Sequence, residues 1–262
     1  MSRFIDKLNQ LSRVEPQPIG FRTAQPVSPK PKIQLVASLA QEGVENLVDH
    51  MAGADAGLLR IANLSSGTKA LQKISQAVPD IPWGGWLQDS GTGGIKQIAK
   101  AGCDFIVFPA TSTPLVILQN DKAGKILEVE ASLSEGLLRA ANELPIDAVL
   151  IAGEESEGYS LTWQHLMLFQ RFADLLTKPL LVHIPPKVTA GELQALWEAG
   201  VDGVILELST EQPQDRLKEL RQVIDKLAFP SPHKREKAEP LLPQTGRETS
   251  TVTADEEEEE EE

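Results

Sequence analysis

Residues 178–208, KPLLVHIPPKVTAGELQALWEAGVDGVILEL, contain one complete strand–helix–strand unit. The apolar run 179–185 predicts a strand, residues 190–199 have the periodicity of an amphipathic helix, and residues 203–208 predict a second strand. Gly200 marks the end of the helix, because glycine adopts the left-handed conformation of a helix C-terminus at no steric cost. A strand, a helix and a strand in this order predict parallel pairing of the two strands.

The same unit repeats along the chain. Strands are predicted at 33–39, 56–61, 81–87, 104–109, 125–130, 147–153, 179–185 and 203–208, and helices at 42–51, 68–78, 94–101, 114–122, 134–144, 162–177, 190–199 and 215–227. The motif Ala-Gly-x-Asp precedes alternate strands, at 52–55, 101–104 and 199–202, with a weaker version at 145–147. Eight strand–helix units predict a single α/β domain, a (β/α)8 TIM barrel. An open doubly wound sheet is the alternative, although its Gly-rich nucleotide turn is missing after residues 33–39.

The two ends of the chain differ from this repeat. Residues 1–31 combine an amphipathic helix over the first thirteen residues with a Pro-rich connector, and the helix either closes the bottom of the barrel or packs on its side. The barrel is expected over 32–228. Residues 229–262 hold four Lys or Arg against eleven Asp or Glu, so we expect a disordered acidic C-terminal tail.

Composition narrows the functional classes. The 262 residues carry a net charge of −13, which argues against a nucleic-acid partner. Apolar runs are too short for a membrane helix and the N-terminus lacks an apolar signal region, so we expect a cytoplasmic protein that does not interact with membranes. A single cysteine, Cys103, excludes an internal disulfide, and the histidine spacing predicts no metal site. The oligomeric state is not indicated.

Active sites of such barrels lie at the C-terminal ends of the strands. Strand alternation turns Gln34, Ser38, Arg60, Glu128, Glu130, His183 and Glu207 toward the barrel axis. Glu130 and His183 are the acid–base candidates, and Ser38, Arg60 and Glu128 are substrate-binding candidates. The alternative is a structural role, in which these buried charges form a satisfied ion network and His183 is a hydrogen-bonded core residue.

Two loops and two tryptophans add candidates. Glu154 belongs to an acidic loop at 153–160, which acts either as a lid over the mouth or as a solvated surface loop. Gly93 and Gly94 precede a predicted helix whose N-terminus is suited to an anion, and a simple flexible turn is the alternative. Trp83 and Trp86 either stack on a ligand or fill the rim of the barrel.

The sequence of residues 178–182, 189–193 and 197–205 resembles that of the aldolase-type, ribulose-phosphate-binding TIM barrels, and FMN-linked barrels share the pattern. The resemblance implies a barrel with a phosphate cradle of glycine N–H groups after its last two strands. Here Pro185-Pro186 and Glu207-Leu208-Ser209 stand at those positions. Proline has no N–H to donate, and a carboxylate repels phosphate, so the usual phosphate site is not expected and no flavin or other cofactor is assigned.

Two functions remain open after these observations. The first is a divergent aldolase-type barrel that binds a small anionic metabolite at its C-terminal face, with isomerase- or lyase-type acid–base chemistry. The second is a catalytically inactive barrel that serves as a binding or scaffold protein. A pocket formed by Glu130, His183 and Arg60 favours the first, whereas a mouth plugged by Trp83, Trp86 or Tyr159 favours the second.

Overall fold

The computed structural model is a closed barrel of eight parallel strands, ordered β1 to β8 around the barrel. It describes residues 2–12, 32–40, 51–88, 97–98, 101–120, 122–153, 159–208 and 215–227. The strands are β1 (Gln34–Leu39), β2 (Ala56–Ile61), β3 (Trp83–Leu87), β4 (Phe105–Pro109), β5 (Gly124–Val129), β6 (Ala148–Ile151), β7 (Leu180–Ile184) and β8 (Gly203–Leu208). The predicted TIM barrel is therefore confirmed, and each predicted strand is present with bounds shifted by at most two residues at either end.

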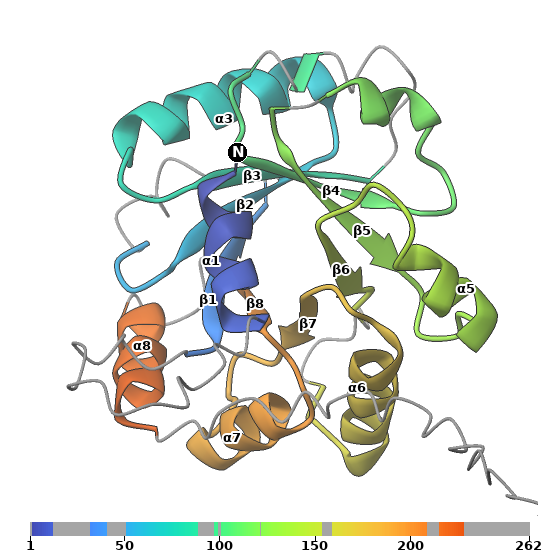
Figure 1. Ribbon diagram of the computed structural model, residues 1–262. Helices are drawn as coiled ribbons and strands as arrows, with labels where there is room; N and C mark the ends of the chain where they lie inside the picture. The colour runs from blue at the N-terminus through green and yellow to red at the C-terminus, as the bar shows by residue number, and fades with distance from the viewer. Residues whose placement is uncertain are drawn as a thin grey trace, which may run out of the picture.

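Helices surround the strands (Figure 1). They are α1 (Arg3–Ser12), α3 (Leu64–Ala77), α5 (Glu135–Ala141), α6 (Trp163–Leu175), α7 (Ala190–Glu198) and α8 (Arg216–Lys226). The predicted helix 114–122 is only a 3-10 turn, η2 (Leu115–Gln119), because extended backbone at Asn120 ends it. The helices expected at 42–51 and 94–101 fall mostly outside the described residues, as does the acidic tail 229–262.

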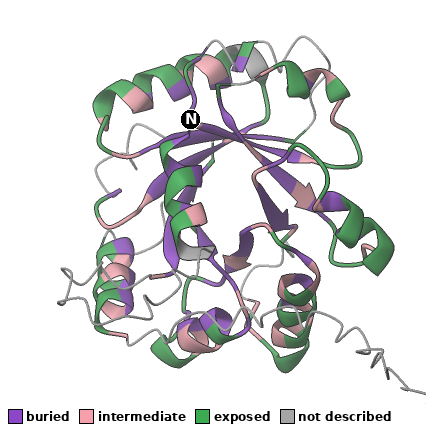
Figure 2. Ribbon diagram, viewed as in Figure 1, coloured by how far each residue is buried: buried purple, intermediate pink, exposed green. Residues whose placement is uncertain are grey.

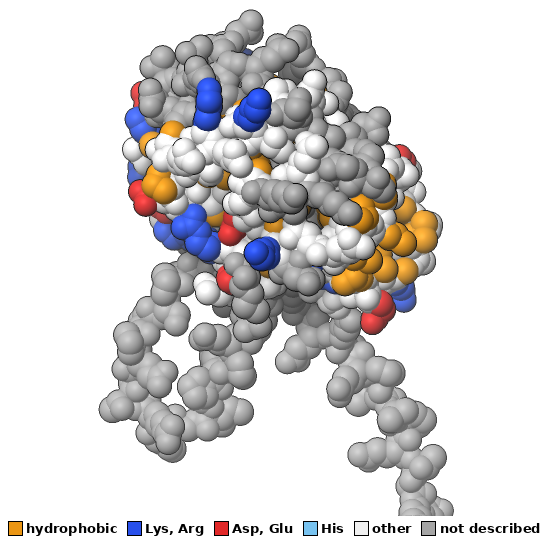
Figure 3. Space-filling model, turned by 90° about the horizontal axis from the view of Figure 1, so that it is seen from above, with side chains coloured by type: hydrophobic (Ala, Val, Ile, Leu, Met, Phe, Trp, Pro, Cys, Tyr) orange, Lys and Arg blue, Asp and Glu red, His pale blue; other side chains and the backbone are white. Residues whose placement is uncertain are grey.

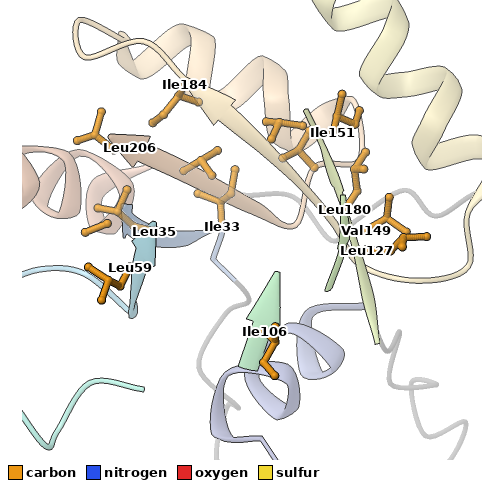
Figure 4. Packing of buried hydrophobic residues seen from close by; sticks show 14 of the residues in the cluster. Ile33, Leu35, Leu59, Ile106, Leu127, Val149, Ile151, Leu180, Ile184 and Leu206 are labelled. Carbon is orange, nitrogen blue, oxygen red and sulfur yellow. The ribbon is translucent and has the colours of Figure 1, made fainter. Parts of the chain in front are cut away.

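Strand alternation divides the apolar residues into two clusters. Leu35, Leu59, Ile106, Leu127 and Val149 face outward and pack with the helices (Figure 4). The opposite faces of the strands fill the barrel with a second cluster, which includes Val36, Leu58, Val107, Ile126, Leu150, Leu181 and Ile205. Figure 2 shows the result, buried strands inside helices whose outer faces are exposed.

The repeated Ala-Gly-x-Asp motif closes the N-terminal end of the barrel. Gly53, Gly102 and Gly200 have φ values of 105°, 78° and 88°, which explains the glycine at each position. In three of four repeats the aspartate carboxylate accepts a backbone N–H from the preceding odd-numbered strand or its start. The aspartates are Asp55, Asp147 and Asp202, and the donors Leu35, Lys125 and Leu180 lie at 2.9, 2.7 and 2.9 Å.

The fourth aspartate, Asp104, holds α1 instead. Its carboxylate accepts the Ser2 hydroxyl at 2.7 Å and the backbone N–H groups of Arg3 and Phe4 at 2.8 and 2.9 Å. The Phe4 ring lies 4.8 Å from that of Phe105, and α1 adds Phe4, Ile5 and Leu8 to the cluster inside the barrel. Of the two placements predicted for the N-terminal helix, the structure shows closure of the bottom, so a ligand must enter from the opposite end. No helix in the described part of the chain combines the length and apolar character needed to cross a membrane.

Candidate functional site at the barrel mouth

Apart from Gln34 at the start of β1, the polar residues inside the barrel lie in its two uppermost layers. Side chains of one layer in such a barrel come from alternate strands. The strand register places Ser38, Trp86, Glu128 and His183 at one height, from the odd-numbered strands, and Arg60 and Glu207 one layer higher. The layer beneath is apolar and consists of Leu58, Val107, Leu150 and Ile205. The interior of the barrel therefore changes from an apolar core to a polar site at the C-terminal ends of its strands.

Trp86 is the centre of this site. Its indole N–H donates to the Glu128 carboxylate at 2.7 Å, and its ring centroid lies 5.2 Å from that of His183. The Arg60 guanidinium covers the ring at 4.6 Å from the ring centroid, a cation–π geometry. Only 6% of Trp86 is exposed. The indole packs inside the barrel, beneath the layer of Arg60 and Glu207, while Trp83 faces the helices and donates its indole N–H to the carbonyl of Val78.

Arg60 also pairs with Glu207 across the top of the barrel. The guanidinium nitrogens lie 3.4 and 3.5 Å from the two carboxylate oxygens, and the Glu207 side chain is 52% exposed. Ion pairs as open as this contribute at most about 1 kcal/mol, because water screens them and the long side chains lose rotamer freedom. The pair therefore rearranges at little energetic cost.

His183 is neutral at neutral pH. Burial, and then the positive charge of Arg60, lower the pKa of His183 to about 4. Gly153, two residues beyond the end of β6, makes room for the imidazole, since a Cβ there would lie 2.9 Å from the ring. The neutral ring keeps one N–H donor and one acceptor nitrogen.

Three buried polar atoms near the mouth have no hydrogen-bond partner among the described residues. They are the Ser38 hydroxyl near the end of β1, the Thr113 hydroxyl in the segment after β4, and Nε2 of His183 on β7. A buried polar group without a partner costs about 1–3 kcal/mol, so each of these groups favours a bound water or ligand.

The predicted site residues divide into three groups. Ser38, Arg60, Glu128 and His183 come together in the two upper layers. Glu130 lies just beyond the end of β5, where its exposed carboxylate accepts the Ser132 hydroxyl at 3.2 Å. Glu154, Gly93 and Gly94 lie outside the described residues.

Sequence reasoning gave Gly153 a role only as an end of the possible lid loop, and it assigned no role to Thr113. The clue to Gly153 is a glycine just beyond an apolar strand, beside the strand that carries a histidine. Thr113 has no comparable signal, because its burial depends on how the segment after β4 folds back. Within the described ranges, no group of three His, Cys, Asp or Glu side chains is suited to a metal ion.

Comparison with known proteins identifies the fold. No protein-family model and no curated protein sequence matches the chain. The tryptophan synthase α-subunit of Pyrococcus furiosus is 11% identical, with a TM-score of 0.58 over 75% of this chain and 98% of that chain. Orotidine 5′-phosphate decarboxylase of Pyrococcus horikoshii is 14% identical, with a TM-score of 0.56 over 73% of this chain and 100% of that chain.

At such low identity these similarities establish the fold alone. Their similarity to this chain confirms the barrel fold that was expected from residues 178–205. The chain is therefore structurally a TIM barrel.

Proposed function

We propose that this protein is a binding barrel that takes a small anionic metabolite at its C-terminal mouth, with Arg60 as the anchor of the anion. The observation that carries the proposal is the position of Arg60, which is held over Trp86 and faces a weakly bound, half-exposed carboxylate. A guanidinium presents a planar fork of N–H donors that matches the oxygens of a carboxylate or phosphate. An anion that replaced the Glu207 carboxylate would bind a guanidinium that the contact with Trp86 already holds in position.

The layer beneath supplies further hydrogen-bonding groups. The Ser38 hydroxyl and Nε2 of His183 need partners, and both lie at the height of Trp86. A ligand or a water molecule bridging from the ligand would satisfy them. We include both residues in the proposed site, together with Glu128, which fixes the indole of Trp86.

Binding explains this geometry better than acid–base catalysis does. A general acid or base is most effective when its pKa lies near the working pH. The pKa of His183 at about 4 leaves no imidazolium to donate a proton at neutral pH. The Glu128 carboxylate is engaged by the Trp86 indole, and the described contact of Glu130 is with Ser132 rather than with His183. Isomerase or lyase chemistry is therefore not part of the proposal.

Trp86 also provides the readout for the test. The chain has four tryptophans, and a ¹⁵N-labelled Trp86→Phe variant identifies which indole N–H signal belongs to Trp86. Titration with acetate or inorganic phosphate should move this signal, and glycerol, which has no charge, should not. Arg60→Ala should abolish the movement, whereas Arg139→Ala, on the exposed side of α5, should retain it. If the anions shift the Trp86 signal equally in the Arg60→Ala variant, Arg60 is not the anchor and the proposal fails.

A role as a scaffold is the second candidate, supported by exposed apolar side chains outside the barrel. On α6, Trp163 is 81% and Met167 65% exposed, one turn apart, and Leu137 on the neighbouring α5 is 58% exposed. On η2, Leu115 is 80% exposed, and Figure 3 shows hydrophobic side chains gathered toward one end of the face it views. If the exposed face of α6 that carries Trp163 and Met167 binds a protein partner, the double variant Trp163→Ser/Met167→Ser should no longer capture that partner in pull-downs and should still bind anions.

A further inference from the structure

Glu207 lies where an anionic ligand would bind. Its carboxylate oxygens lie opposite the two terminal nitrogens of Arg60, in the arrangement in which a guanidinium binds a ligand carboxylate. A second carboxylate, Glu128, lies one layer below and contacts the same tryptophan that Arg60 covers. Among the described side chains of this cluster, the carboxylates of Glu128 and Glu207 lie beside one guanidinium, that of Arg60, and His183 is neutral.

Resting on the proposed anion site, we infer that Glu207 is an internal competitor for Arg60 and selects ligands that carry one negative charge. A monocarboxylate replaces the Glu207 carboxylate with a group of the same charge and shape. A dianion, such as a phosphate ester above its second pKa, meets twice the repulsion from Glu128 and from the displaced Glu207. The ligand class is therefore a small monocarboxylate rather than a sugar phosphate.

The side chain of Glu207 is more exposed than that of Arg60. Its exposure of 52% lets it rotate toward water when a ligand arrives, while Arg60, at 20%, stays packed over Trp86. Glu207 therefore acts as a specificity-determining residue: it lowers the affinity for every anion, and lowers it most for those of highest charge.

Neutralising Glu207 tests the inference. Two unit charges about 5 Å apart in water interact enough to change a binding constant about fourfold, and the effect applies once for each ligand charge. In Glu207→Gln we therefore expect acetate to bind about fourfold more tightly, and malonate or inorganic phosphate at pH 8 more than tenfold. The assay is the titration of the Trp86 indole signal at low ionic strength. The matched control is Glu198→Gln at the end of α7, on the opposite end of the barrel, which should behave as wild type.

The outcomes separate the two proposals. Tighter binding with a selective gain for the dianions, lost again in Arg60→Ala/Glu207→Gln, supports the competitor role. Equal affinities in wild type and Glu207→Gln, with Arg60→Ala still abolishing binding, overturn the competitor role and leave the anion site standing. A Trp86 signal that no anion moves in either wild type or Glu207→Gln overturns both. Malonate and phosphate have similar charge, so a response to only one of them would show that shape, not charge, decides and would also overturn the inference.

Discussion

Protonation of His183 should destabilise the folded protein in mildly acidic solution. The ordinary pKa of a histidine is 6.5, and burial and Arg60 lower that of folded His183 to about 4. Between these two pH values the unfolded chain binds more protons than the folded one, so stability falls as the pH decreases. One pKa unit corresponds to 1.36 kcal/mol, and the contribution of His183 lost between pH 7 and pH 4 is therefore about 3 kcal/mol.

The measurement is the free energy of unfolding in denaturant, at several pH values between 4 and 7, for wild type and His183→Gln. The substitution removes the titrating group, so its stability should fall by about 3 kcal/mol less than that of wild type over this range. Absolute stability is not the readout, because glutamine also loses the contact with Trp86. Parallel curves for wild type and His183→Gln would refute the reasoning, since they would show that His183 is not buried as a neutral ring.

Three other predictions follow from particular contacts. Asp104→Ala removes the acceptor of three hydrogen bonds from the start of the chain, and the free energy of unfolding in denaturant should fall by about 2–3 kcal/mol. An unchanged denaturation midpoint would mean that α1 does not depend on this carboxylate. Gly153→Ala forces a Cβ against His183 and should lower the free energy of unfolding by about 1–3 kcal/mol. Gly191→Ala, with open space around it on α7, should raise the free energy of unfolding by up to about 1 kcal/mol. Equal shifts of the melting temperature in the two variants would contradict the close approach at Gly153. Burial raises the pKa of Cys103 to about 12, so a thiol reagent at pH 8 should modify it only after unfolding, and rapid labelling of the native protein would show that the site opens.

Much of the barrel was predictable because it depends on local patterns. Alternation in β5 correctly turns Glu128 inward and Leu127 outward, and the same rule places Arg60 and His183 inside. The prediction of a helix at 114–122 was wrong, because the backbone turns extended at Asn120 and only the 3-10 helix η2 forms. The two open roles of Trp86 could not be resolved either, since they depend on which side chains arrive from β2, β5 and β7.

The sequence by itself determined the positions of the eight strands, their inward and outward faces, and the repeated Gly-x-Asp before alternate strands, because short-range periodicity and glycine conformation encode these features. Only the tertiary structure decided that α1 plugs the bottom, that Asp104 departs from its three equivalents to hold it, and that Arg60, Trp86, Glu128, His183 and Glu207 form one cluster. The physical reason is that closing the barrel brings together strands far apart in the chain. The pKa of His183 and the exposure of Glu207 arise from those neighbours and not from the residues beside them in sequence.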